Sequence, residues 1–154
     1  MSDIYGKYYN MVCEDGLKIL DVPDQYMTTD LCLQAVSQYG KAISYIPSHL
    51  MDYNICKVAV SNKGSLQYVP SKYKSEEICK LALNNNVDQL QYVPRKYITK
   101  KLCFELLNKD LKAIKYIPRS FKDKKMYDKI YRDMSNIIDC LPKEIFDIKI
   151  KMNK

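Results

Sequence analysis

The six prolines of this chain recur at an almost constant interval. They lie 24, 23, 24, 24 and 24 residues apart, at Pro23, Pro47, Pro70, Pro94, Pro118 and Pro142. A fixed period in this range is typical of repeat proteins, in which each unit buries its apolar face against its neighbours. The 154-residue chain is therefore expected to form one repeat domain.

Signals for an α-helix recur inside each period. Apolar pairs stand eight and nine residues after the proline and again twelve and thirteen residues after it, as in Ile78-Cys79 and Ala82-Leu83. This spacing places both pairs on one stripe of an amphipathic helix. Five residues after each proline stands a side chain whose oxygen can cap a helix N-terminus. These predicted caps are Thr28, Asp52, Ser75, Thr99, Asp123 and Asp147.

A shorter second helix is expected between the first helix and the next proline. An apolar residue stands four positions before each proline and another immediately before it, as Leu90 and Val93 do ahead of Pro94. This i, i+3 pair is the expected buried edge of the second helix. In three repeats the first helix should end at a glycine in the left-handed conformation, which is common after helix C-termini. These glycines are Gly16, Gly40 and Gly64.

The patterns predict an all-α fold, an α-solenoid of helix-turn-helix repeats of about 24 residues. A leucine-rich repeat has a similar period, and residues 78–86 imitate its strand pattern. The other repeats place Gln34, Val58, Glu105 or Lys129 at the required leucine, which favours the helical reading. The predicted parts are a capping repeat at 1–22, full repeats at 23–46, 47–69, 70–93, 94–117 and 118–141, and a half-repeat cap at 142–154 with a short helix from about Asp147.

Net charge is +7, and it is unevenly spread. Residues 94–154 hold seventeen basic and eight acidic side chains, whereas residues 1–46 hold three basic and six acidic ones. This asymmetry is typical of a chain whose basic half meets an anionic partner, and also of a solvated lysine-rich surface. Both readings remain open from the sequence.

Four cysteines occupy one position of successive repeats: Cys32, Cys56, Cys79 and Cys103. Layers of packed helices lie roughly 10 Å apart, which exceeds the Cα separation that a disulfide allows. We expect buried thiols in a cytoplasmic protein. The chain has no apolar run of the roughly 20 residues that a membrane helix needs, and its first residues do not resemble a signal peptide.

Residues suited to catalysis or metal binding are scattered along the chain. The single histidine, His49, stands in a predicted turn, and its nearest cysteine, Cys56, belongs to the predicted core. The regularly spaced cysteines provide no zinc-ligand cluster. The four glycines form no phosphate-binding loop. We expect a protein that is not an enzyme and uses neither a cofactor nor a metal.

A tyrosine stands two residues before four of the prolines: Tyr45, Tyr68, Tyr92 and Tyr116. These rings should be half exposed, either to cover the layer beneath or to form an aromatic strip for a peptide or for nucleotide bases. Only the later repeats place basic turn residues beside them. We hypothesise a contact edge for an acidic or phosphate-bearing partner, formed by Tyr92, Tyr116, Arg95, Lys96 and Arg119.

The repeated motif is Leu-x-Tyr-Val-Pro, a polar turn, and then Leu/Ile-Cys-x-x-Ala-Val, as in LQYVPSKYKSEEICKLAL and ISYIPSHLMDYNICKVAV. It resembles short helical repeats of unknown function that are abundant in giant DNA viruses such as the mimivirus group and also occur in some bacteria. The resemblance covers roughly residues 10–142, although Tyr127 and Cys140 stand where Cys and Tyr are expected. It implies an all-α viral interaction module acting in the host cytoplasm, and it transfers no catalytic residue.

The expected function is therefore a protein–protein interaction scaffold or adaptor with a protein partner of acidic character. One alternative is a nucleic-acid-binding protein that uses the basic C-terminal half. Another is a structural component that associates with further copies of itself. No membrane partner is expected.

Overall fold

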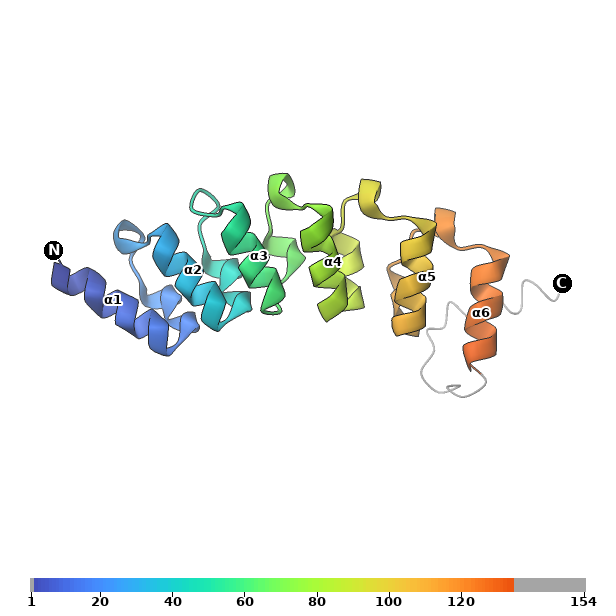
Figure 1. Ribbon diagram of the computed structural model, residues 1–154, viewed down its shortest axis with the longest axis horizontal. Coiled ribbons are helices and arrows are strands. Elements are labelled where there is room, and N and C mark those ends of the chain that lie inside the picture. Colours follow the sequence, from blue (N-terminus) through green and yellow to red (C-terminus); the bar gives the residue numbers. More distant parts are fainter. Residues whose placement is uncertain (1, 135–154) are drawn as a thin grey trace. The chain divides into compact units, whose positions relative to one another are not determined.

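The computed structural model describes residues 2–134, and every regular element within them is helical (Figure 1). No strand occurs in this range, so the all-α prediction is confirmed and the leucine-rich alternative is wrong. Among these residues no helix has the length and apolarity needed to cross a bilayer. The α-helices are α1 (Ser2–Glu14), α2 (Thr29–Gln38), α3 (Tyr53–Ser61), α4 (Glu76–Asn85), α5 (Lys100–Lys109) and α6 (Lys124–Met134).

The predicted second helix is a 3₁₀-helix in each of the first five repeats: η1 (Gly16–Asp21), η3 (Gly40–Tyr45), η4 (Leu66–Tyr68), η6 (Val87–Tyr92) and η8 (Leu111–Lys115). This type agrees with the i, i+3 apolar spacing, because side chains three residues apart lie on one side of a 3₁₀-helix. A single 3₁₀ turn also follows four of the prolines. These turns are η2 (Asp24–Tyr26), η5 (Ser71–Tyr73), η7 (Arg95–Tyr97) and η9 (Arg119–Phe121).

The chain divides into two compact units, residues 1–97 and residues 98–154. In the first unit α1 packs against α2, α2 against α3 and α3 against α4 (Figure 1). The 3₁₀-helices of this unit contact each other as well, η1 with η3 and η4 with η6. In the second unit α5 packs against η8. The single domain and its repeat boundaries stay a prediction, and the half-repeat cap at 142–154 lies outside the described residues.

The predicted helix caps are present throughout the described residues. In five repeats the capping side chain accepts a hydrogen bond from the backbone N–H three residues later, over 2.7–3.3 Å: Thr28, Asp52, Ser75, Thr99 and Asp123. The sixth predicted cap, Asp147, lies outside the described residues. The 3₁₀-helices have caps of their own, which the sequence did not lead us to expect. There the side chains of Asp15, Ser65, Asn86 and Asp110 accept from the N–H two residues later.

The predicted apolar stripe forms the core of both units. In α4 its four residues are Ile78, Cys79, Ala82 and Leu83, none more than 3% exposed. The edge of the following 3₁₀-helix is buried with them, since Leu90 is 1% and Val93 6% exposed. The four regularly spaced cysteines are buried and free of disulfides, as predicted. Burial raises the pKa of Cys32 and of Cys56 to about 11, so both thiols stay neutral.

The glycines do not adopt the left-handed conformation that the sequence led us to expect. Gly16, Gly40 and Gly64 instead allow the backbones of neighbouring repeats to approach each other closely. A Cβ atom on Gly16 would overlap the carbonyl oxygen of Ala35, and one on Gly40 would overlap that of Ala59. In each case the start of a 3₁₀-helix abuts the end of the next α-helix, so that only a residue without a side chain fits there.

The left-handed residue is Lys63, with a φ of 66°. Its N–H bonds to the carbonyl of Val60 over 3.1 Å, and the N–H of Gly64 bonds to that of Ala59 over 2.7 Å. These two bonds form a Schellman motif that ends α3. Glycine is the usual residue at this position, because a Cβ atom is disfavoured in the left-handed region.

The repeat between Pro47 and Pro70 is one residue shorter than the others, and its 3₁₀-helix η4 has only three residues. The side chain of Gln89, from the next repeat, supplies hydrogen bonds at the start of this shortened helix. Its Oε1 atom accepts the N–H of Leu66 over 2.8 Å and the hydroxyl of Ser65 over 3.3 Å. The N–H of Leu66, the buried first residue of this short helix, is thereby satisfied.

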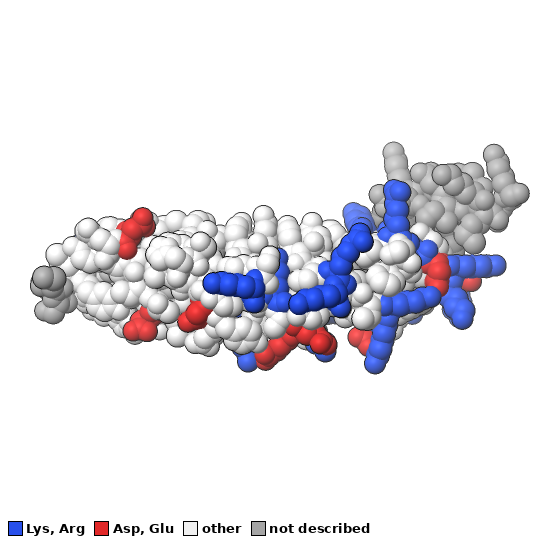
Figure 2. All heavy atoms as spheres, turned by 90° about the horizontal axis from the view of Figure 1, so that it is seen from above, with Lys and Arg blue, Asp and Glu red and all other residues white. Residues whose placement is uncertain are grey.

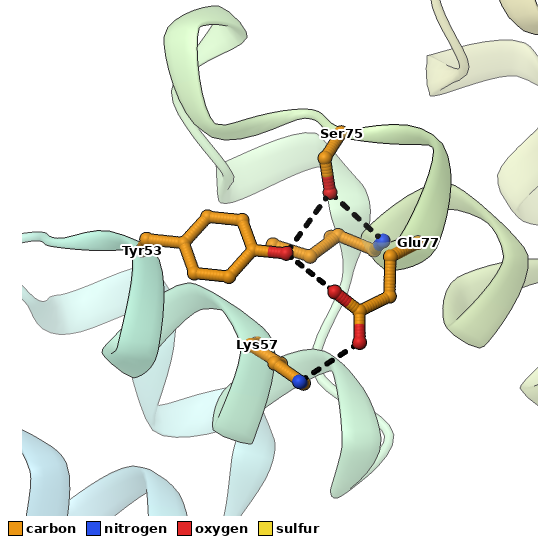
Figure 3. A network of polar contacts seen from close by, with 5 residues as sticks. Tyr53, Lys57, Ser75 and Glu77 are labelled. Atoms are coloured by element: carbon orange, nitrogen blue, oxygen red, sulfur yellow. Dashed lines mark hydrogen bonds and ion pairs between the residues drawn. The ribbon is translucent and has the colours of Figure 1, made fainter.

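Polar side chains also join successive α-helices near their N-termini (Figure 3). The hydroxyl of Tyr53 in α3 donates to Glu77 in α4 over 2.6 Å and lies 3.3 Å from the hydroxyl of the cap Ser75. The Lys57 ammonium lies 2.8 Å from the other Glu77 oxygen. This ion pair, and then the Tyr53 hydroxyl, lower the pKa of Glu77. Two equivalent contacts join a residue near a helix start to the next cap, Tyr5 to Thr28 and Lys100 to Asp123.

Candidate interaction groove

A groove of about 610 Å³ opens on the side of the first unit formed by the 3₁₀-helices. Its walls come from four consecutive repeats: η1, η3, η4 and η6 contribute, together with the C-terminal end of α4. We call this surface the groove throughout. It is lined by Leu17, Tyr39, Lys41, Ser44, Tyr45, Lys63, Gly64, Ser65, Tyr68, Ala82, Asn85, Asn86 and Gln89.

The volume of the groove is that of a ligand-binding pocket, and its expected length matches a short peptide segment. Pockets for small ligands measure about 300–1,000 Å³, and the groove falls within that range. Packed helices lie about 8–10 Å apart, so three steps between four repeats amount to roughly 25–30 Å. An extended chain advances about 3.3 Å per residue, and about eight residues would therefore span this length.

Three tyrosines give the groove its aromatic surface. Tyr39 is 38% exposed, and Tyr45 and Tyr68 are each 45% exposed. The half-exposed state predicted for the tyrosines before the prolines is therefore confirmed for Tyr45 and Tyr68. Tyr39 was missed, because it precedes a glycine rather than a proline. Such rings combine an apolar face with a hydroxyl that can donate to a ligand.

The groove is basic although the unit that contains it is not. Residues 1–97 hold ten basic and ten acidic side chains. The thirteen lining residues include Lys41 and Lys63 and no carboxylate. Neither lysine forms an ion pair with a carboxylate of the described residues, in contrast to Lys18, Lys57 and Lys80. An anionic group in the groove would therefore meet two ammonium groups without a competing carboxylate in its lining.

Side-chain amides hold the walls of the groove in place. The amide of Asn62 donates to the carbonyls of Val36 and Ser37 over 3.1 and 3.0 Å, and that of Asn85 donates to Val60 over 2.7 Å. Each bond reaches back to a carbonyl in the last turn of the preceding α-helix, where side chains commonly supply hydrogen bonds that the helix itself does not. The carbonyl of Val60 accepts the N–H of Lys63 as well. Together with Gln89, these amides fix the spacing of the repeats that form the groove.

The predicted contact edge lies partly in the first unit. Tyr92 is half-buried, and Arg95 and Lys96 are exposed. The carbonyl of Tyr92 accepts from the Lys74 ammonium over 3.2 Å, and burial lowers the pKa of that lysine. The Lys96 ammonium lies 4.8 Å from the ring centre of Tyr97, a cation–π distance.

One repeat earlier the same arrangement recurs, with the Lys72 ammonium 4.7 Å from the ring centre of Tyr73. On the face seen in Figure 2, the N-terminal end of the molecule is mainly uncharged with a few acidic side chains, and long basic side chains stand over later elements. The turns after the first two prolines, Asp24-Gln25-Tyr26 and Ser48-His49-Leu50, contain no lysine or arginine. Lysine and arginine are therefore absent from the first two proline turns and present in the later ones, in line with the uneven charge of the sequence.

The other two members of the predicted edge belong to the second unit. Tyr116 is half-buried at the end of η8, and Arg119 is exposed at the start of η9. Because the five residues divide between two units, one edge made of all five stays a prediction. Among the described residues, no three His, Cys, Asp or Glu side chains gather where a metal ion could bind.

Residues 28–74 match a protein family described as a domain of unknown function (DUF4116). The matched segment runs from the cap of α2 through η5 and covers under a third of the chain. It includes Tyr39, Lys41, Tyr45, Lys63 and Tyr68 of the groove. No curated protein and no solved structure matches the chain.

Proposed function

We propose that this chain is a non-enzymatic repeat protein, a scaffold or adaptor that binds a segment of another protein in the groove of its first unit. The observation that carries the proposal is the row of exposed tyrosines Tyr39, Tyr45 and Tyr68 along one open groove. Tyrosine is enriched among the residues that dominate binding energy at protein interfaces. A groove with fixed walls also limits the entropy lost when a partner binds.

The proposal includes an α-solenoid architecture. In its support, an α-helix, a 3₁₀-helix and a proline turn recur in the same order at the proline interval. Within the first unit each α-helix packs against the next one along the chain. Solenoids bind partners along extended surfaces made of equivalent positions, and the groove is built in this way. The resemblance of the motif to giant-virus repeats supports a viral protein that acts in the host cytoplasm.

A display experiment tests the proposal. Random octapeptides on phage are selected on the full chain and then titrated against Tyr45→Ala/Tyr68→Ala. We expect selected peptides to bind the double variant at least about tenfold more weakly, since one hot-spot residue contributes more than about 1 kcal/mol. Tyr53→Ala is the matched control, because Tyr53 is 40% exposed and lies outside the groove. Absence of enrichment, or equal binding by the double variant, would overturn the proposal.

The second candidate function is binding of nucleic acid by the C-terminal half. The observation in its favour is the excess of seventeen basic over eight acidic side chains in residues 94–154. Gel shifts with single- and double-stranded DNA and RNA at two salt concentrations test it. Binding that weakens steeply with salt supports this function. Light scattering of the same preparation tests the further alternative of a self-associating structural component.

A further inference from the structure

We infer that the groove selects acidic peptide segments in an extended conformation, and that Lys63 is the residue that sets this selectivity. The inference rests on the proposed function and names the class of partner. Three observations carry it: the backbone conformation of Lys63, the charge of the groove and the exposure of its tyrosines.

Lys63 occupies a position where glycine would be more favourable for folding. It is left-handed, and it is the position in the Schellman motif where glycine is usual. It is also the only non-glycine residue with a positive φ among the described residues. A lysine in the left-handed region is less favourable for folding than glycine would be. When such a residue lines a candidate binding site, we infer that its side chain has a function there. That side chain adds a cation to the groove.

Charge complementarity identifies the partner. Lys41 and Lys63 line the groove without a carboxylate among the lining residues, and neither is neutralised by an ion pair in the described part of the chain. A glutamate or aspartate side chain of a bound segment would supply the missing counter-charge. Lys41 and Lys63 come from neighbouring repeats, so the segment must cross from one repeat to the next. An extended chain along the groove does so.

The tyrosines explain why the ligand is a peptide rather than a small anion. Tyr45 and Tyr68 are equivalent residues of the same two repeats that contribute the lysines. Each of these two repeats thus presents one lysine and at least one tyrosine to the groove. A peptide with acidic residues between apolar ones can contact both the ammonium groups and the apolar faces of the rings, whereas an inorganic anion leaves those apolar faces uncovered.

The test uses three pools of fluorescent octapeptides, in which every second residue is Glu, Gln or Lys and the others are randomised. Binding to the full chain is measured by anisotropy at low and high salt. We expect the Glu pool to bind at least about threefold more tightly than the Gln pool at low salt, with the Lys pool weakest. The preference should shrink at high salt, since exposed charges are screened.

Variants of Lys63 separate binding from folding. Lys63→Gly and Lys63→Asn both suit the left-handed region, and Lys63→Gly should raise the melting temperature. Both should weaken binding of the Glu pool by about threefold to fivefold and leave the Gln pool unchanged. Lys63→Arg should keep the preference for the Glu pool. Lys7→Gln, which removes an exposed lysine outside the groove, should behave as the wild type.

The outcomes distinguish the inference from the proposed function. If peptides bind through Tyr45 and Tyr68 without preferring glutamate, or if Lys63→Gly retains the preference, the inference is overturned and the proposed function stands. If no peptide pool binds, both fail. A single-stranded oligonucleotide and the unlabelled Glu pool are also compared as competitors of the fluorescent Glu pool. If the oligonucleotide competes more strongly, the inference is overturned in favour of nucleic acid. A wild-type chain that dimerises through the groove, with dimerisation lost in Tyr45→Ala/Tyr68→Ala, overturns it in favour of a second copy.

Discussion

Gly40 lies so close to the carbonyl oxygen of Ala59 that a Cβ atom at position 40 would overlap it. The two residues belong to consecutive repeats, one at the start of η3 and the other inside α3. Their contact brings the backbone of a 3₁₀-helix directly against an α-helix. The spacing of these repeats therefore depends on the absence of a side chain at this position.

Gly40→Ala should destabilise the protein by about 1–3 kcal/mol, because the added methyl group forces backbone atoms apart. Gly6→Ala is the matched control. Gly6 lies inside α1, where a Cβ atom would meet nothing within 4 Å, and alanine there should stabilise by about 0.5–1 kcal/mol. Urea unfolding of both variants measures the difference. A neutral or stabilising effect of Gly40→Ala would show that the repeats are not packed as described.

The glycines show where sequence reasoning reached its limit. A glycine after a helix is usually explained by its own backbone conformation, and that explanation predicted left-handed residues here. The glycines are required because backbone from the next repeat lies against them. For Gly40 this is the carbonyl of Ala59, 19 residues later in the chain, and local sequence gives no sign of such a contact. Caps and core residues were predictable, because Ser75 and Ile78 act within their own turn and stripe.

Gln89→Leu should destabilise the protein by about 1–3 kcal/mol, because it leaves the buried N–H of Leu66 without its acceptor. Gln89→Glu keeps an oxygen at that position and should remain close to the wild type. Gln67→Leu changes an exposed glutamine in the same repeat pair and should alter stability by no more than about 0.5 kcal/mol. Chemical denaturation of the three variants checks the order. Equal stability of Gln89→Leu and Gln67→Leu would contradict the compensating role of Gln89.

Leu90→Ala should destabilise by about 2–5 kcal/mol, as expected for removal of a large side chain from a packed core. Leu90 is 1% exposed, whereas Leu20, in the equivalent 3₁₀-helix of the first repeat, is 57% exposed. Leu20→Ala should therefore change stability by no more than about 0.5 kcal/mol. Thermal unfolding followed by circular dichroism compares the two. An unchanged melting temperature for Leu90→Ala would refute its place in the core.

The Glu77 ion pair should make stability depend on pH in the acidic range. Lys57, and then Tyr53, lower the pKa of Glu77 below its ordinary value of 4.5. Since the pKa is lower in the folded than in the unfolded state, the stabilisation is present above pH 4.5 and is lost as pH falls through the folded value.

The melting temperature of the wild type should therefore exceed that of Glu77→Gln at pH 7, and the difference should shrink as pH falls below 4.5. Glu14→Gln, at an exposed glutamate that has no ion pair within the described residues, controls for the substitution itself. A difference that stays constant down to pH 3 would show that the contact in Figure 3 does not form in solution.

The groove was only partly predictable for the same reason as the glycines. The regular tyrosines could be read from their place before the prolines, and Tyr45 and Tyr68 have the expected half-exposed state. Tyr39, Lys41 and Lys63 belong to no repeated column of the same residue type, so periodicity gave no signal for them. They meet only when the 3₁₀-helices of successive repeats are placed side by side.

Photo-crosslinking tests most directly whether acidic peptide segments bind in the groove. A benzophenone amino acid replaces Tyr68 in one variant and Tyr53 in another. Tyr68 lies in the groove and is 45% exposed, whereas Tyr53 lies outside it and is 40% exposed. Each variant is irradiated with biotinylated Glu-pool octapeptides, and the crosslinked residue is identified by mass spectrometry. The groove account predicts crosslinks from position 68 that unlabelled Glu pool competes away, with little from position 53. Equal crosslinking at both positions, or crosslinks from position 53 alone, would contradict it.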